Sequence, residues 1–244
     1  MRIKCGNMFI DCRIVRKNIK NINIRVENSG EIIVSCPVHT DMKVVESIVR
    51  DKNEWILQRL NTVKERKDKL KKLGIGGMTG LPFLGKVLPV EKYEINTDKL
   101  SVKFADDRVI ICGNEKLFSD RESMRCEVYK AYKKNLYAVL MERIDIYREI
   151  LGVRPLKISV RSQKTIWGSC SSGGNLSFNC RLMMAPLKAI DYVVVHELCH
   201  MVYMNHSRTY WNLVESVIPD YRDAQKWLDD NGYMLNFYFY DVFL

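Results

Sequence analysis

The sequence predicts an α+β fold in which a β-rich N-terminal subdomain (1–118) precedes a C-terminal domain (119–244). Apolar and polar residues alternate over residues 22–26, which is typical of a half-buried strand. From residue 41 to about 72 the apolar residues recur with helical spacing instead. The chain of 244 residues is 47% hydrophobic and 28% charged, which provides enough apolar side chains for a sizeable core.

The first 36 residues predict a β-hairpin. Residues 22–26 and 31–36 both have strand composition, and Asn28, Ser29 and Gly30 between them are turn formers. The helix expected at 41–72 has an apolar stripe formed by Val44, Val45, Ile48, Trp55, Ile56, Leu57 and Leu60. Four glycines and a proline at 74–82 end that helix, and their spacing does not match a phosphate-binding loop.

Short strands at 86–90 and 109–112 complete the predicted N-terminal subdomain. Ser119 and Glu122 then have the spacing of a capping box, with Ser119 as N-cap and Glu122 at the third helical position. This pattern predicts a long helix that runs to about Leu151 and stops at Gly152, and its start marks the expected domain boundary.

The C-terminal domain is expected to contain a strand at 157–161 and a hairpin formed by 165–170 and 176–179. An edge strand in this hairpin could pair with the main chain of a peptide. An ordinary structural hairpin explains the pattern equally well.

Three helices are predicted to follow. Pro186 suits the first turn of a helix that reaches about Met204. Ser207 can cap a second helix, which Pro219 ends, and a third helix covers about 221–230 before Asn231 and Gly232.

Three of the four histidines of the chain lie within the eleven residues 196–206. His196 and His200 are four residues apart, so on a helix their imidazoles project from one face and can share a metal ion. His206 can supply the third protein ligand if the helix ends near Asn205. Glu197 follows the first histidine, where it can act on a bound water without being a ligand. The alternative is a pair of ordinary histidines beside an unrelated glutamate.

This arrangement predicts a site for one zinc ion in a hydrolase. Glu197 would take a proton from a zinc-bound water molecule while that water attacks a peptide carbonyl. Glu197 would then give the proton to the leaving amine. Nickel, cobalt and copper also bind to sets of three histidines. Tyr203, Tyr210 and Arg208 are nearby candidates for stabilising the oxyanion, but packing is the favoured role for the tyrosines, and none of the three is assigned as catalytic.

The net charge of +10 is concentrated at the beginning of the chain. Residues 1–80 contain 17 Lys and Arg against 9 Asp and Glu, a net charge of +8. The densest basic stretch, 64–72, is either a solvated helix end or a patch for nucleic acid or another polyanion. It contains acidic residues and no aromatic ones, which favours the solvated helix end.

The remaining composition points to a cytoplasmic protein. The start of the chain lacks the apolar segment of a secretory signal, and no apolar run is long enough to cross a membrane. None of the eight cysteines forms a Cys-x-x-Cys pair, so we expect reduced and mostly buried thiols.

The motif around the histidines resembles that of the YgjP-like metal-dependent hydrolases, which are related to the SprT-like and WLM zinc peptidases. The resemblance rests on 196–200, 205–207 and 210–211, and it extends to 165–170, 179–182, 185–186, 218–221, 16–18, 34–37 and 55–56. The same histidine spacing occurs in metzincins, but Tyr203 stands where they have a glycine, and no Met-turn follows.

The resemblance implies a gluzincin-type α/β core with zinc on His196, His200 and His206 and with Glu197 as base. It favours a metallopeptidase acting on peptides or proteins. Two alternatives stay open: a metal-dependent pyrophosphatase acting on nucleoside triphosphates such as UTP, and a nucleic-acid-associated protein that uses its basic N-terminal half.

Overall fold

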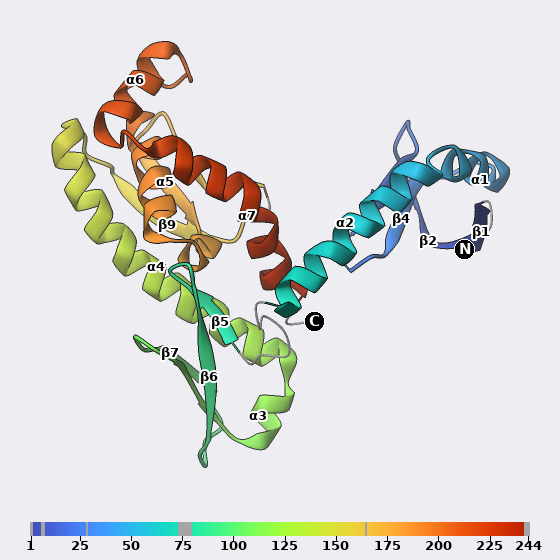
Figure 1. The fold of residues 1–244 in the computed structure, drawn as a ribbon, viewed down its shortest axis with the longest axis horizontal. Helices are drawn as coiled ribbons and strands as arrows, with labels where there is room; N and C mark the ends of the chain where they lie inside the picture. Colours follow the sequence, from blue (N-terminus) through green and yellow to red (C-terminus); the bar gives the residue numbers. More distant parts are fainter. Residues whose placement is uncertain (1, 6–7, 28, 73–79, 164, 242–244) are drawn as a thin grey trace. The chain divides into compact units, whose positions relative to one another are not determined.

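The computed structural model describes residues 2–5, 8–27, 29–72, 80–163 and 165–241 (Figure 1). The contacts divide the chain into two compact units, Met1–Lys72 and Leu73–Leu244. No helix in the described ranges is both long enough and apolar enough to cross a bilayer.

The first unit has a four-stranded sheet in the order β1-β2-β4-β3. Its strands are β1 (Arg2–Cys5), β2 (Met8–Lys17), β3 (Asn23–Val26) and β4 (Ile32–Pro37). The antiparallel pairing of β3 with β4 confirms the predicted hairpin, while β2 runs parallel to β4.

The helix predicted at 41–72 is two helices, α1 (Met42–Asp51) and α2 (Asn53–Lys72). Lys52 interrupts them with a non-helical backbone (φ −97°, ψ 11°). The interruption lets Val45 and Val49 of α1 and Ile56 of α2 bury their side chains in one cluster on the sheet. The basic stretch 64–72 forms the last turns of α2, and its side chains at 66 and 69–72 lie outside the described residues.

The second unit begins with another four-stranded sheet, in the order β5-β6-β8-β7. Its strands are β5 (Gly80–Phe83), β6 (Lys86–Glu94), β7 (Ser101–Phe104) and β8 (Val109–Gly113). β6 and β8 contain the two strands predicted in this region. The buried Tyr132 hydroxyl of the following long helix donates a hydrogen bond of 2.6 Å to the carbonyl of Pro82. Because this sheet packs on that helix, it belongs to the second compact unit, which begins at Leu73. The division into domains 1–118 and 119–244 stays a prediction.

The predicted long helix is confirmed as α4 (Arg121–Leu151), but the prediction that Ser119 is its N-cap is wrong. Asp120 is the N-cap and accepts hydrogen bonds from the amides of Glu122 and Ser123. Ser119 is instead the last residue of a short helix, α3 (Glu115–Ser119), which Asn114 caps. Gly152 closes α4 in the left-handed conformation (φ 67°), as predicted.

A three-stranded sheet follows, in the order β10-β11-β9. The hairpin of β10 (Gly168–Cys170) and β11 (Asn175–Asn179) is confirmed, and β9 (Lys157–Arg161) runs parallel to β11. A 3₁₀ turn, η1 (Cys180–Met184), leads to α5 (Leu187–Cys199). Helices α4 and α5 contact each other and this sheet (Figure 1).

The last helices differ from the predictions at their ends. Pro186 is the N-cap of α5, and α5 stops at Cys199 rather than near Met204. The amides of Val202 and Tyr203 bond to the carbonyl of Cys199 in a tight turn, which brings the chain back towards the helix. Ser207 caps α6 (Arg208–Val217), as predicted.

The final helix, α7 (Tyr221–Asp241), continues through Asn231 and Gly232, where the prediction ended it. A Cβ at Gly232 would lie 2.8 Å from Cζ2 of Trp167. The glycine therefore allows the Trp167 ring to approach the helix closely and does not act as a helix stop.

Candidate metal centre

Helix α5 carries two of the three clustered histidines and is held firmly in the second unit. Val194, Val195 and Leu198 on this helix are fully buried. Asp191 accepts two hydrogen bonds from the guanidinium of Arg143 on α4, at 2.5 and 3.0 Å. This paired ionic contact and the apolar packing fix the position of the helix that presents the histidines.

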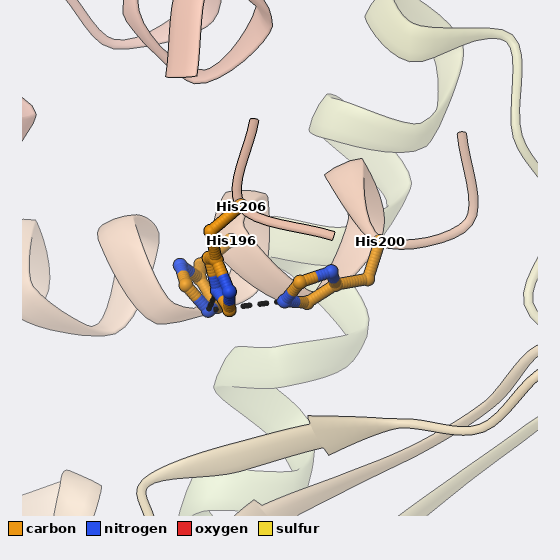
Figure 2. A group of neighbouring side chains, drawn as sticks. All are labelled: His196, His200 and His206. Atoms are coloured by element: carbon orange, nitrogen blue, oxygen red, sulfur yellow. Dashed lines mark hydrogen bonds between the residues drawn. The ribbon is translucent and has the colours of Figure 1, made fainter. Parts of the chain in front are cut away.

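The structure brings His196, His200 and His206 together (Figure 2). Nε2 of His196 lies 3.3 Å from Nε2 of His200 and 3.3 Å from Nε2 of His206. Tetrahedral coordination with Zn–N bonds of 2.0–2.1 Å requires N–N separations of about 3.3–3.4 Å. Two of the three separations match this value, and all three ligand atoms lie within 4.8 Å of one another, so the three imidazoles can hold a single metal ion, with His206 supplied by the chain that turns back after α5.

The orientation of His200 and His196 is fixed by contacts outside the cluster. Nδ1 of His200 lies 3.1 Å from the carbonyl oxygen of Tyr203, so it donates its proton there and leaves Nε2 with a lone pair. The hydroxyl of Tyr210 donates to the carbonyl of His196 at 2.9 Å. The buried Tyr210 ring also packs against all three imidazoles, with centroid distances of 4.7–5.5 Å.

One of the three candidates for oxyanion stabilisation, Tyr210, has another partner for its hydroxyl. The Tyr210 hydroxyl is occupied by the His196 carbonyl, so this residue holds the histidines in position. Tyr203 and Arg208 are exposed. No local sequence pattern signals the supporting role of Tyr210, because its contacts cross from α6 to α5.

Burial keeps His196 and His200 neutral, which is the form that binds metal. The pKa of His196 is lowered to about 3, first by burial and then by the neighbouring His200 and His206. Burial also lowers the pKa of His200. Both imidazoles are therefore uncharged at neutral pH and available as ligands.

Glu197 is buried, with 4% of its surface exposed, and lies outside the cluster of metal-binding atoms. Burial raises the pKa of its carboxyl to about 8. The side chain lies against Gly168 of β10, where an added Cβ would be 2.5 Å from Oε1 of Glu197 and 2.7 Å from its Cγ. Gly168, which no sequence motif marks as a site residue, leaves the space that this carboxyl occupies.

A comparison with models of protein families shows to which family the chain belongs. The family model described as the YgjP-like metallopeptidase domain matches residues 20–231. The chain belongs to the YgjP-like family. The resemblance found in the sequence is thereby confirmed, and the mixed α and β elements of this YgjP-like protein are consistent with a metallopeptidase fold.

Among solved structures, the YgjP-like chain is similar to the metallopeptidase zymogen of abylysin from Pyrococcus abyssi. The two share 22% sequence identity, and the match covers 37% of this chain and 93% of that one, with a TM-score of 0.35. The comparison with curated proteins finds no significant match.

Replacing Gly168 with alanine is expected to lower the hydrolytic activity of this YgjP-like protein by about 10²-fold, because the new Cβ displaces the Glu197 carboxyl. Gly173→Ala, in the turn of the same hairpin, is the matched control, since a Cβ there meets its nearest neighbour at 3.6 Å. Rates of peptide hydrolysis at equal metal content measure the effect. Equal activity of the two variants would refute the role given to Gly168.

Proposed function

We propose that this protein is a zinc-dependent peptidase in which His196, His200 and His206 hold the metal and Glu197 is the catalytic base. The observation that supports this most strongly is the pair of 3.3 Å separations between the histidine Nε2 atoms. The membership of the YgjP-like metallopeptidase family supports the reaction class.

A bound zinc ion would supply a Lewis acid that acidifies water and polarises a substrate carbonyl. Glu197 is suited to proton transfer because burial raises its pKa to about 8, close to neutral pH. A metal ion held by the three histidines would add positive charge beside this carboxyl and so would favour its carboxylate form, which can accept a proton. The protonated carboxyl can then donate to the leaving amine.

Strand β10 is suited to hold the peptide. It lies at the edge of the sheet, and in the described part of the chain no strand pairs with its outer side. Glu197 packs against Gly168 of the same strand, so a peptide added to this edge passes close to the proposed base.

Metal removal combined with a choice of substrates tests this function. The purified protein should contain about one zinc ion per chain, and it should cleave unstructured peptides. A chelator should abolish the cleavage, and added zinc should restore it. The control is UTP incubated with the same samples. Release of pyrophosphate from UTP without any peptide cleavage would contradict the peptidase and favour the nucleotide hydrolase.

A further inference from the structure

Strand β3 lies at an edge of the sheet in the first unit, and helix α2 runs alongside it. The sheet order β1-β2-β4-β3 leaves the outer side of β3 without a paired strand in the described part of the chain. Towards the start of the strand, Trp55 of α2 lines a hollow together with Ile24. Beyond the end of the strand, Nζ of Lys67 donates a hydrogen bond of 2.7 Å to the carbonyl of Ser29. The helix therefore follows the strand from one end to the other.

Two adjoining hollows form a groove between β3 and this helix. The first, of about 240 Å³, is lined by residues 22–24 on the strand side and by Lys52 on the helix side. The second, of about 280 Å³, is lined by residues 24–26 and by Arg59. Trp55 lines both hollows, so they form one continuous groove along the free edge of the sheet.

The groove has an apolar floor and an aromatic wall. Ile22, Ile24 and Val26 are only partly buried where they pack against the core of the unit. The indole of Trp55 is 37% exposed, and the guanidinium of Arg59 lies 5.6 Å from the centroid of its ring. An edge strand beside exposed apolar surface offers both main-chain hydrogen bonds and side-chain contacts to an added strand.

The charged residues that line the groove are all cations among the described residues: Arg25, Lys52 and Arg59. Arg25 forms an ion pair of 2.7 Å with Glu27. Within the described ranges no acidic side chain forms an ion pair with Lys52 or Arg59. Residues 1–72 contain 17 Lys and Arg against 9 Asp and Glu, a net charge of +8. The unit therefore attracts acidic ligands, and the groove offers them two cations.

The spacing of the helix wall suits one pattern of side chains. The carbonyl of Lys52 accepts a hydrogen bond of 2.9 Å from the amide of Ile56, so Lys52 lies on the first turn of α2. Along this helix, Trp55 follows Lys52 after about 4.5 Å, and Arg59 follows Trp55 after about 6 Å. Alternate residues of an extended peptide are about 6.6 Å apart. An apolar residue with an acidic residue two positions to either side therefore matches the wall, whichever way the peptide runs.

We propose that the groove between β3 and α2 is a docking site for an extended acidic segment of a partner protein, which adds a strand to β3. Lys52 and Arg59 face the two carboxylates, and Trp55 contacts the apolar side chain between them. The proposal goes beyond the peptidase function and does not depend on it, because every residue involved belongs to the first unit.

The free strand edge and the single aromatic wall residue favour a peptide over single-stranded nucleic acid. Trp55 is the one aromatic side chain that lines the groove in the described ranges. Proteins that bind single strands stack successive bases on several aromatic rings. A peptide instead uses the backbone groups that β3 leaves unpaired at its outer side.

The test uses the zinc-loaded full chain with Glu197→Gln, so that the probe is not cleaved, and measures binding by fluorescence anisotropy. The labelled probe has glutamate, leucine and glutamate at alternate positions with threonine between them, and the control peptide has glutamine in place of both glutamates. Lys52→Glu/Arg59→Glu reverses the two cations of the groove. The matched control, Lys43→Glu/Lys64→Glu, changes the charge equally at exposed residues of α1 and α2 that do not line the groove.

We expect the acidic peptide to bind at least about tenfold more tightly than the glutamine peptide. The reversal in the groove should weaken it about tenfold, and the control should change it less than about twofold. Lys52 and Arg59 are exposed, so both variants should fold. Equal weakening by both variants, or equal affinity for the two peptides, would overturn the proposal. Displacement of the peptide by equimolar oligouridylate would also overturn it, because the groove would then be a nucleic-acid site.

Two methylated probes test the pairing with β3. In a paired strand, alternate backbone amides face the neighbouring strand and the others face away. One acidic peptide carries methyl groups on one set of alternate backbone nitrogens, and a second peptide carries them on the other set. Since methylation removes the N–H donor, one of these peptides should lose at least about tenfold in affinity while the other binds like the unmethylated probe. Equal affinities of the two methylated peptides would show that no strand is added.

Discussion

Replacing Glu197 with glutamine is expected to lower peptide hydrolysis by about 10²–10⁴-fold while leaving the bound metal in place. Glutamine has nearly the same shape and keeps the packing against Gly168, but it cannot accept a proton. The carboxyl also lies outside the cluster of metal-binding atoms, so its loss does not remove a ligand. Rates of peptide cleavage and zinc content per chain measure the two halves of this expectation.

Glu215→Gln is the matched control, because Glu215 is exposed on α6 and no interaction with the histidines involves it. It should retain full activity. Cleavage by Glu197→Gln at the native rate would show that another group is the base. A loss of zinc from this variant would show that the carboxyl is needed for metal binding.

The same substitution has a second readout in the metal-free protein. Because burial raises the Glu197 pKa from 4.5 to about 8, the folded state holds its proton more tightly than the unfolded state. Between these two pH values the free energy of unfolding therefore falls as the pH rises. Glu197→Gln removes this contribution, so its stability should fall less over the same range. Denaturant titrations at several pH values measure the difference.

Replacing His206 with alanine is expected to weaken zinc binding by more than about 10²-fold, which exceeds the 10–100-fold effect of losing an outer-shell partner. His206 supplies one of the three converging Nε2 atoms, and two histidines leave the ion without a complete set of protein ligands. The residue is exposed, so the unfolding free energy of the metal-free protein should change by less than about 0.5 kcal/mol. Zinc titration with a competing chelator measures the affinity.

His39→Ala is the control for this prediction. His39 is the one histidine outside the cluster, and it is exposed in the first unit. It should bind zinc as tightly as the unsubstituted protein. Unchanged affinity in His206→Ala would remove this residue from the proposed ligand set and leave a site with two histidines.

Local patterns predicted most elements of the fold. The hairpin of β3 and β4, the long helix α4 and its stop at Gly152 follow from periodicity and turn chemistry, which act over a few residues. Predictions were wrong where packing between distant segments decided the outcome. Gly232 is typical of a helix stop in sequence, yet α7 continues through it, and the missing side chain instead leaves room for the Trp167 ring.

The sequence by itself determined the chemistry that this chain can offer. Its spacing of His196, Glu197, His200 and His206 restricts the candidates for metal binding to one short segment, because a helix turn brings residues four apart to one face. Tertiary structure alone decided how that segment is used. No local pattern encodes the contacts between elements on which three features depend. These are the early end of α5, the support that Tyr210 gives to the histidines, and the space that Gly168 leaves for Glu197. The row of Ser159, Ser177 and Ser169 across the three-stranded sheet arises in the same way, since pairing three strands aligns serines that are distant in the sequence.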